Sequence, residues 1–170
     1  MSGKEVNFRS EKRRDRLVRQ SSHDPYRQHS KYPDSCQCEH CGVAYLSGRW
    51  QWTDDLLIKA NPVVCPACQR TRQRVPPGYL TLTGDCLKLD KNEILRLIHN
   101  KVDEQKAQHP LKRLIAIEEN DQGELLLTFT DIHMPHSIGE AVQRACKGEF
   151  SVRYVKEEDS ARAYWKRNQV

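Results

Sequence analysis

The sequence predicts an α+β protein in which a small zinc-ribbon or knuckle module precedes a ferredoxin-like β-α-β-β-α-β domain with an extra C-terminal edge strand. Two Cys-x-x-Cys pairs fall within residues 35–77, which we expect to form a four-cysteine zinc module. Apolar patterns typical of strands and helices alternate through residues 78–170, the expected α+β domain. The Pro76-Pro77-Gly78 stretch marks the boundary. Residues 1–34 form a basic arm that we expect to be disordered.

The expected domain over residues 78–170 contains five strand-like and two helix-like segments. The strands are predicted at 79–83, 111–118, 124–130, 149–155 and 161–167. One helix is predicted from Asp90, which has the spacing of a capping box with Glu93, to residue 108, and the other over 135–147. A sheet with both helices on one face satisfies this order. Its outward residues do not look rich in aromatics, so we do not expect a base-stacking platform.

The composition narrows the class of protein. The chain has 170 residues, of which 37% are hydrophobic and 30% charged, and no apolar run approaches the roughly 20 residues needed to cross a bilayer. The N-terminus has no apolar core of a secretory signal, so we expect a cytoplasmic protein with no membrane partner. In that reducing compartment, the seven cysteines favour metal ligands or buried thiols over disulfides.

The cysteine spacing is the strongest chemical signal. Cys38, Cys41, Cys65 and Cys68 form a C-x2-C-x23-C-x2-C pattern, which predicts one structural zinc ion per chain in a closed tetrahedral site. Cys36 or His40 could replace one of these ligands, and a redox role for a single pair is a weaker alternative. Cys86 and Cys146 fit the apolar pattern of the second domain as buried thiols.

Cationic residues suggest contact with a polyanion. Residues 1–35 contain nine lysines and arginines against five acids and so carry most of the net charge of +5. These basic residues also fit a solvated tail, and the two tryptophans at 50 and 52 could equally form the core of the zinc module. Three arginines alternate after the second knuckle and would give one cationic edge, or an ordinary solvated segment. The candidate RNA-binding residues are Lys12, Arg13, Arg14, Arg16, Arg49, Trp50, Arg70, Arg72 and Arg74.

No enzyme motif stands out. Asp131 and His133 lie where a strand passes into a helix, and a hydrolase using them is the weakest alternative. Capping of the helix by Asp131 or Thr130 explains the same residues. Neither a small-molecule substrate nor a catalytic role is expected.

Several short motifs together resemble a bacterial family of small zinc-binding proteins over residues 24–168. That family is distantly similar to the adaptor family that exports the large ribosomal subunit and binds ribosomal RNA. Two positions depart from the pattern: His136-Ser137 stands where a basic pair is usual, and Gln73 or Arg74 where an acid is usual. The matching motifs are Cys38-x2-Cys41-Gly42, Gly48-Arg49-Trp50-x-Trp52, Cys65-Pro66-Ala67-Cys68, Pro77-Gly78, Leu80-Thr81-Leu82-Thr83-Gly84, His109-Pro110-Leu111-x-Arg113, Thr130-Asp131-Ile132-His133 and Ile138-Gly139-Glu140-Ala141.

The resemblance and the charge distribution imply the same function. We expect a non-enzymatic zinc-binding protein that associates with structured RNA, on the ribosome or its assembly intermediates. The alternative is a zinc-ribbon adaptor that docks a protein partner without touching nucleic acid.

Overall fold

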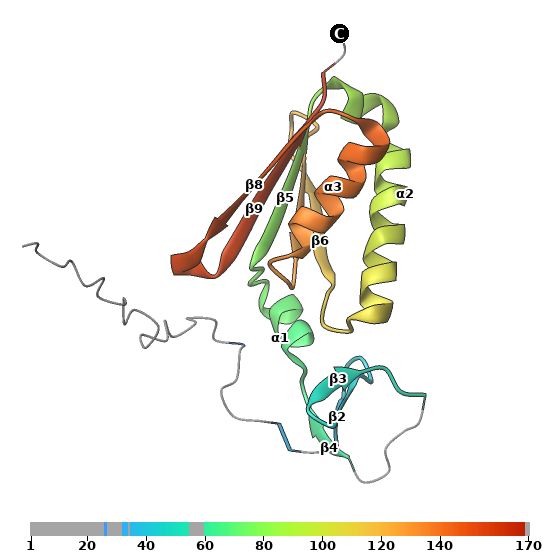
Figure 1. Ribbon diagram of the computed structural model, residues 1–170, viewed down its shortest axis with the longest axis vertical. Coiled ribbons are helices and arrows are strands. Elements are labelled where there is room, and N and C mark those ends of the chain that lie inside the picture. Colours follow the sequence, from blue (N-terminus) through green and yellow to red (C-terminus); the bar gives the residue numbers. More distant parts are fainter. Residues whose placement is uncertain (1–25, 27–31, 34, 55–59, 169–170) are drawn as a thin grey trace, which may run out of the picture.

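The computed structural model describes Tyr26 and residues 32–33, 35–54 and 60–168 of the chain (Figure 1). The predicted arm residues Lys12, Arg13, Arg14 and Arg16 lie outside these ranges. The described residues form a small cysteine module and a larger α+β domain, and α1 of the module lies next to the domain (Figure 1). The predicted fold class is confirmed. None of the described helices combines the length and apolar character that a bilayer crossing requires.

The cysteine module (residues 35–77) is built on four strands of three residues each. They are β1 (Cys36–Cys38), β2 (Ala44–Leu46), β3 (Arg49–Gln51) and β4 (Asn61–Val63), in the order β3-β2-β1-β4. A helix, α1 (Pro66–Gln73), follows. The buried cluster of the module contains Val43 and Ala67 together with three of the cysteines, so the sulfur atoms themselves supply much of this core.

Three aromatic rings extend that small core. Trp50 packs against Tyr45 at 5.3 Å and against Tyr32 at 4.9 Å between ring centroids. Tyr32 belongs to the segment assigned to the arm, so the module draws on a residue that precedes it. Trp50 is half-buried against the cysteine cluster, so the interpretation that the two tryptophans form the core is confirmed for Trp50. It is wrong for Trp52, which is 38% exposed.

The α+β domain contains a five-stranded sheet whose order is β6-β7-β5-β9-β8. Helices α2 and α3 both lie on one face of this sheet, as predicted (Figure 1). A short 3-10 helix, η2 (Lys156–Glu158), joins the last two strands. The elements are β5 (Gly78–Thr83), α2 (Asp85–Gln108), β6 (Leu114–Glu119), β7 (Leu125–Phe129), α3 (Met134–Cys146), β8 (Glu149–Val155) and β9 (Ser160–Lys166).

The predicted edge position of the C-terminal strand is wrong. β9 pairs in parallel with β5 and antiparallel with β8, so β8 forms the edge. The alternation of Ala161, Ala163 and Trp165 indicates one buried face, and it would look the same at an edge or in the interior. The interior place buries Trp165, which is 1% exposed and donates from its indole N–H to the carbonyl of Lys147 at 2.7 Å. Deep burial of this large ring stabilises the inserted arrangement.

Helix α2 begins five residues before its predicted start. Asp90, the predicted N-cap, instead interrupts the helix with φ −109° and ψ 18°. The apolar residues beyond it face the sheet as expected, because Ile94, Ile98 and Val102 are all buried in the core.

Helix α3 lies unusually close to β8. A Cβ atom added at Gly139 would come within 2.1 Å of Cε2 of Phe150. The absence of a side chain at this position therefore lets the Phe150 ring pack directly on the helix backbone.

Candidate metal centre

The first cysteine pair lies on a tight turn at the end of β1. The amide of Gly42 donates to the carbonyl of Cys38 at 2.9 Å, and the amide of Cys38 donates to the carbonyl of Val43 at 2.8 Å. Gly42 adopts φ +77°, a left-handed conformation that glycine reaches without steric cost. This turn explains why glycine follows the second cysteine of the pair.

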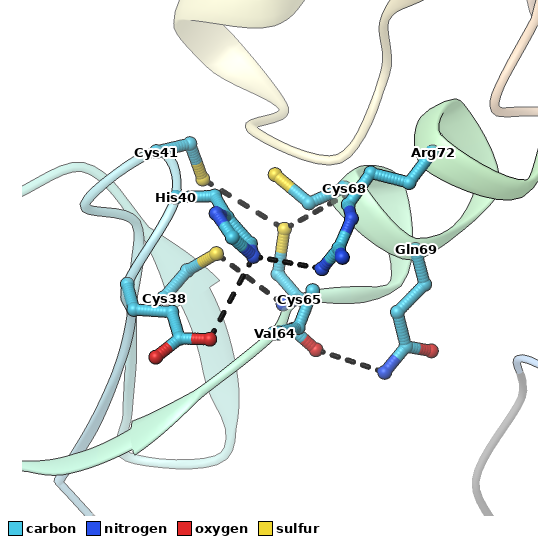
Figure 2. Close-up of polar contacts among 9 residues, drawn as sticks. Cys38, His40, Cys41, Val64, Cys65, Cys68, Gln69 and Arg72 are labelled. Carbon is cyan, nitrogen blue, oxygen red and sulfur yellow. Dashed lines mark hydrogen bonds and ion pairs between the residues drawn. The ribbon is translucent and has the colours of Figure 1, made fainter.

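The second pair opens helix α1. Cys65 is its N-cap, and its sulfur accepts a hydrogen bond from the amide of Cys68 at 3.4 Å. Pro66 occupies the first turn, where its missing N–H costs nothing. The amide of Cys65 in turn donates to the Cys38 sulfur at 3.3 Å, which connects the two turns (Figure 2).

The four sulfur atoms of Cys38, Cys41, Cys65 and Cys68 all lie within 4.8 Å of one another. Cys41 and Cys65 are 3.8 Å apart between their sulfurs (Figure 2). Four thiolates bound tetrahedrally at about 2.3 Å would place neighbouring sulfurs about 3.8 Å apart. The cluster can therefore hold one metal ion, and these are the four residues that the spacing predicts.

Neither alternative ligand belongs to the cluster. Cys36 is fully buried on β1 and lies outside the group of close sulfurs. The His40 Nε2 lies 2.9 Å from the guanidinium of Arg72 and 3.6 Å from the carboxylate of Glu39 (Figure 2). The His40 side chain is thus engaged with charged neighbours instead of the sulfurs.

The surroundings of the cysteine thiols shift the pKa values of Cys38 and Cys65 in opposite directions. Burial opposes ionisation of Cys38, but backbone N–H donors, with that of Cys65 foremost, outweigh it and lower the pKa of Cys38 to about 7. Burial raises the pKa of Cys65, and the neighbouring Cys41, Cys38 and Cys68 raise it further. One thiolate therefore forms readily near neutral pH, whereas full deprotonation of the set requires a compensating cation.

Arg113 supplies a fixed positive charge beside the cysteines. Its guanidinium donates to the sulfur of Cys41 at 3.1 Å and to that of Cys68 at 3.3 Å, with Cys65 at 3.9 Å. Burial lowers the pKa of Arg113, but the hydrogen bond and charge of the sulfur atoms reverse this effect and raise it. A divalent ion with four thiolates carries two negative charges, so a guanidinium here offsets part of that excess.

The loop before β6 holds Arg113 in place. Its Nε donates to the carbonyl of Pro110 at 2.9 Å, and its backbone N–H donates to the hydroxyl oxygen of Thr130 at 2.8 Å. The Thr130 hydroxyl donates to the carbonyl of Leu111 at 2.6 Å. Thr130, the second candidate for capping α3, therefore fixes the Arg113 loop instead and does not cap the helix.

Trp52 provides a second contact between the module and the α+β domain. Its indole N–H donates to the carbonyl of Lys106 on α2 at 2.8 Å. The Arg113 guanidinium lies 5.6 Å from the centroid of the Trp52 ring. The sequence predicts neither role: it offers Trp52 as part of the core of the zinc module, whereas this ring is 38% exposed, and Arg113 appears only within a matched motif.

The predicted cationic edge of residues 70–74 is wrong. These residues belong to α1 and its C-cap, and positions two apart on a helix point in nearly opposite directions. Arg70 is buried, donates to the carbonyl of Val75 at 3.3 Å and lies 4.5 Å from the ring centroid of Tyr26. Arg72 and Arg74 are exposed at the end of α1, and Arg49 is exposed on β3.

Asp131 and His133 serve the start of α3. The carboxylate of Asp131 accepts the backbone N–H of His133 at 2.8 Å, which closes a turn just before the helix. His133 is the N-cap of α3 and no side chain caps the helix, so the predicted capping by Asp131 is wrong. The His133 ring is exposed and lies 6.2 Å from the ring of Tyr154. In the described part of the chain, the four-cysteine cluster is the one group of three or more His, Cys, Asp or Glu side chains close enough to share a metal ion.

The cysteine cluster, its guanidinium neighbour and the docking of Trp52 define a compact centre between two parts of the molecule. No family model, curated protein or solved structure matches the chain.

Proposed function

We propose that the protein is a non-enzymatic, cytoplasmic zinc-binding protein that associates with structured RNA, on the ribosome or its assembly intermediates. The four-sulfur cluster is the observation that carries this proposal. A tetrahedral set of thiolates favours zinc over the harder divalent ions, which prefer oxygen ligands. The four cysteines would fill the coordination shell of one structural zinc ion per chain, so no position remains for a substrate or a reactive water.

The charge of the molecule supports the RNA part of the proposal. The chain has 28 lysines and arginines against 23 acids. Arg49, Arg72 and Arg74 are exposed on the cysteine module and can contact phosphate groups. The basic arm would add a salt-dependent attraction, because each neutralised phosphate releases counterions. The resemblance to the ribosomal export adaptor family points to the same class of partner.

Metal analysis tests the proposal that the protein binds zinc. The purified protein is expected to contain one equivalent of zinc, and Cys65→Ser is expected to lose it. Cys36→Ser is the matched control, because Cys36 is equally buried but its sulfur lies outside the cluster. Retention of zinc by Cys65→Ser, or its loss in Cys36→Ser, would contradict the assigned ligand set.

Sedimentation of a cell lysate through a sucrose gradient tests the proposed association with RNA on a ribosomal particle. The protein is expected to comigrate with a ribosomal particle at low salt and to leave it as the salt concentration rises. Treatment with ribonuclease should release it as well. Association that survives both treatments would favour the alternative, a zinc-ribbon adaptor docked on a protein partner.

A further inference from the structure

The face of the five-stranded sheet opposite α2 and α3 is exposed to solvent over β8 and β9. Side chains of β9 alternate, so that Ala163 and Trp165 are buried under the helices whereas Arg162, Tyr164 and Lys166 are exposed. The residues of β8 that pair with them, Glu149, Ser151 and Arg153, are exposed too. The sequence predicts no base-stacking platform on this sheet, because its outward residues do not look rich in aromatics. The insertion of β9 beside β5 nevertheless places Tyr79 and Tyr164 on the same outward face of adjacent strands.

Two tyrosines and three cations occupy this surface. Tyr79 on β5 pairs with Arg162, whose guanidinium lies 4.5 Å from the centroid of the Tyr79 ring. Tyr164, two residues along β9, is 50% exposed. Tyr79 and Tyr164 are diagonal neighbours on adjacent strands, which typically lie roughly 7–8 Å apart, so both residues belong to one face of the sheet. We call the set Tyr79, Arg153, Arg162, Tyr164 and Lys166 the tyrosine face.

The charge on this side of the sheet is uneven. Arg153 and Arg162 are direct cross-strand partners, so two cations meet on β8 and β9. One acid, Glu149, lies opposite Lys166. The pairing of Glu118 with Leu126 places an acid on the same face, toward the other edge, on β6. The cationic half therefore coincides with the half that carries the tyrosines.

A hollow of about 450 Å³ marks the same half of the sheet. Thr83, Ser151, Tyr164 and Lys166 line it, together with the acid Glu149 that lies opposite Lys166. It lies beside the exposed Tyr164 ring. A flat group that stacks on this ring would have Lys166 within reach of an attached anion.

We propose that the tyrosine face binds an unpaired segment of RNA, with one base on the Tyr164 ring and another on the guanidinium that covers Tyr79. This inference rests on the proposed function and adds a second contact surface to it, separate from the cysteine module. Bases stack on aromatic rings and on guanidinium planes, and cations between them hold the phosphates. An acidic peptide would satisfy the cations but would leave both ring faces unused, whereas a duplex hides its bases.

Fluorescence anisotropy with a short, labelled, uridine-rich RNA tests the proposal on the full chain. Tyr164→Thr keeps a residue suited to a strand but removes the ring, and it is expected to weaken binding roughly five- to one-hundred-fold. Tyr154→Thr is the matched control, because Tyr154 is similarly exposed on the neighbouring strand but lies on the opposite face. Arg162→Gln is expected to lower the salt slope by about 0.7 for each phosphate that is no longer neutralised. Arg144→Gln, an exposed arginine on α3, should leave the slope unchanged.

Each further outcome decides between explanations. Equal thermal midpoints of the variants would show that the weaker binding does not reflect unfolding, and Tyr164→Phe should restore binding. If the protein comigrates with ribosomal particles but Tyr164→Thr and Arg162→Gln bind RNA like the unmodified protein, the tyrosine face is overturned and the proposed function stands. If no RNA binds in either experiment, both fail. A poly-glutamate peptide that binds more tightly than the oligonucleotide, and loses that binding in Tyr164→Thr, would identify an acidic peptide instead.

Discussion

At the scale of single residues, Arg113 shows how a distant side chain completes a cysteine site. Its guanidinium contacts three of the four sulfurs, and its own position depends on Pro110 and Thr130. Residues that hydrogen-bond to metal ligands commonly change the affinity for the metal by about 10–100-fold when they are replaced.

Replacement of Arg113 is therefore expected to weaken metal binding. Arg113→Gln removes the positive charge and should lower the affinity for zinc by about 10–100-fold. Arg113→Lys keeps the charge but cannot span two sulfurs, so an intermediate reduction is expected. Competition with a chromophoric chelator measures both.

Arg72→Gln serves as the control, because the Arg72 guanidinium contacts His40 and not a sulfur. Its zinc affinity should match that of the unmodified protein. If Arg113→Gln also retained full affinity, the guanidinium would have no role in holding the metal.

The sequence predicts the four cysteines but not this arginine, for a physical reason. Two residues separate the ligands within each pair, so local turn geometry alone brings their sulfurs together. Arg113 lies 45 positions from Cys68 and 72 from Cys41 along the chain. That contact depends on how two parts of the molecule dock, which no local pattern encodes.

At the scale of elements, α1 shows that alternating arginines do not by themselves indicate an extended strand. Alternation of Arg70, Arg72 and Arg74 suggests an extended edge, but the chain forms a helix from Pro66. A signal for that helix is present, since a proline after a residue whose side chain can cap is typical of a helix start. The cysteine at 65 acts as that cap through its sulfur.

The contact between α3 and β8 gives a prediction at this scale. Gly139→Ala would place a methyl group inside the Phe150 ring, so it is expected to reduce the free energy of unfolding by about 1–3 kcal/mol. Chemical denaturation measures the change.

A second substitution distinguishes crowding from other effects. Phe150→Leu should create space and make Gly139→Ala much less destabilising in the double variant than alone. Additive destabilisation in the double variant would show that the ring is not the source of the cost.

At the scale of the whole molecule, the four-cysteine cluster that can hold a metal ion lies in one part of the protein and contacts the other part through Arg113. The cysteine module has a small core, of which sulfur atoms form a large share. The α+β domain has its own core of more than a dozen buried residues, which include Leu80, Ile98 and Trp165. The two parts meet through Arg113 and Trp52.

Removal of the metal should accordingly unfold one part and spare the other. Binding energy in such modules is largely folding energy, so chelation is expected to abolish amide protection in β1–β3 and α1. Amides of β5 and β9 should stay protected in the same hydrogen-exchange experiment, because their core contains no metal ligand.

Re-addition of zinc should restore protection in the module. Equal loss of protection in β5 and β9 would mean that the α+β domain depends on the metal centre, contrary to this division.

The order of elements in the α+β domain was predictable, but the place of the last strand was not. Periodicity places Ala161, Ala163 and Trp165 on one buried face, and that face is correct. Which neighbours a strand has depends on the competition between pairings over the whole sheet. The parallel pairing of β9 with β5 joins residues more than 80 positions apart, so no local sequence pattern in either strand predicts it.

The central position of β9 also bears on how the protein is made. Strands β5 and β8 are not hydrogen-bonded to each other, so β8 can join the sheet only after β9 has paired with β5. A nascent chain therefore cannot close this domain until residue 166 has left the ribosomal exit tunnel, whereas the cysteine module can take up its ion much earlier in synthesis. Loss of β9 would therefore separate β8 from the rest of the sheet, whereas loss of an edge strand would leave the other strands paired.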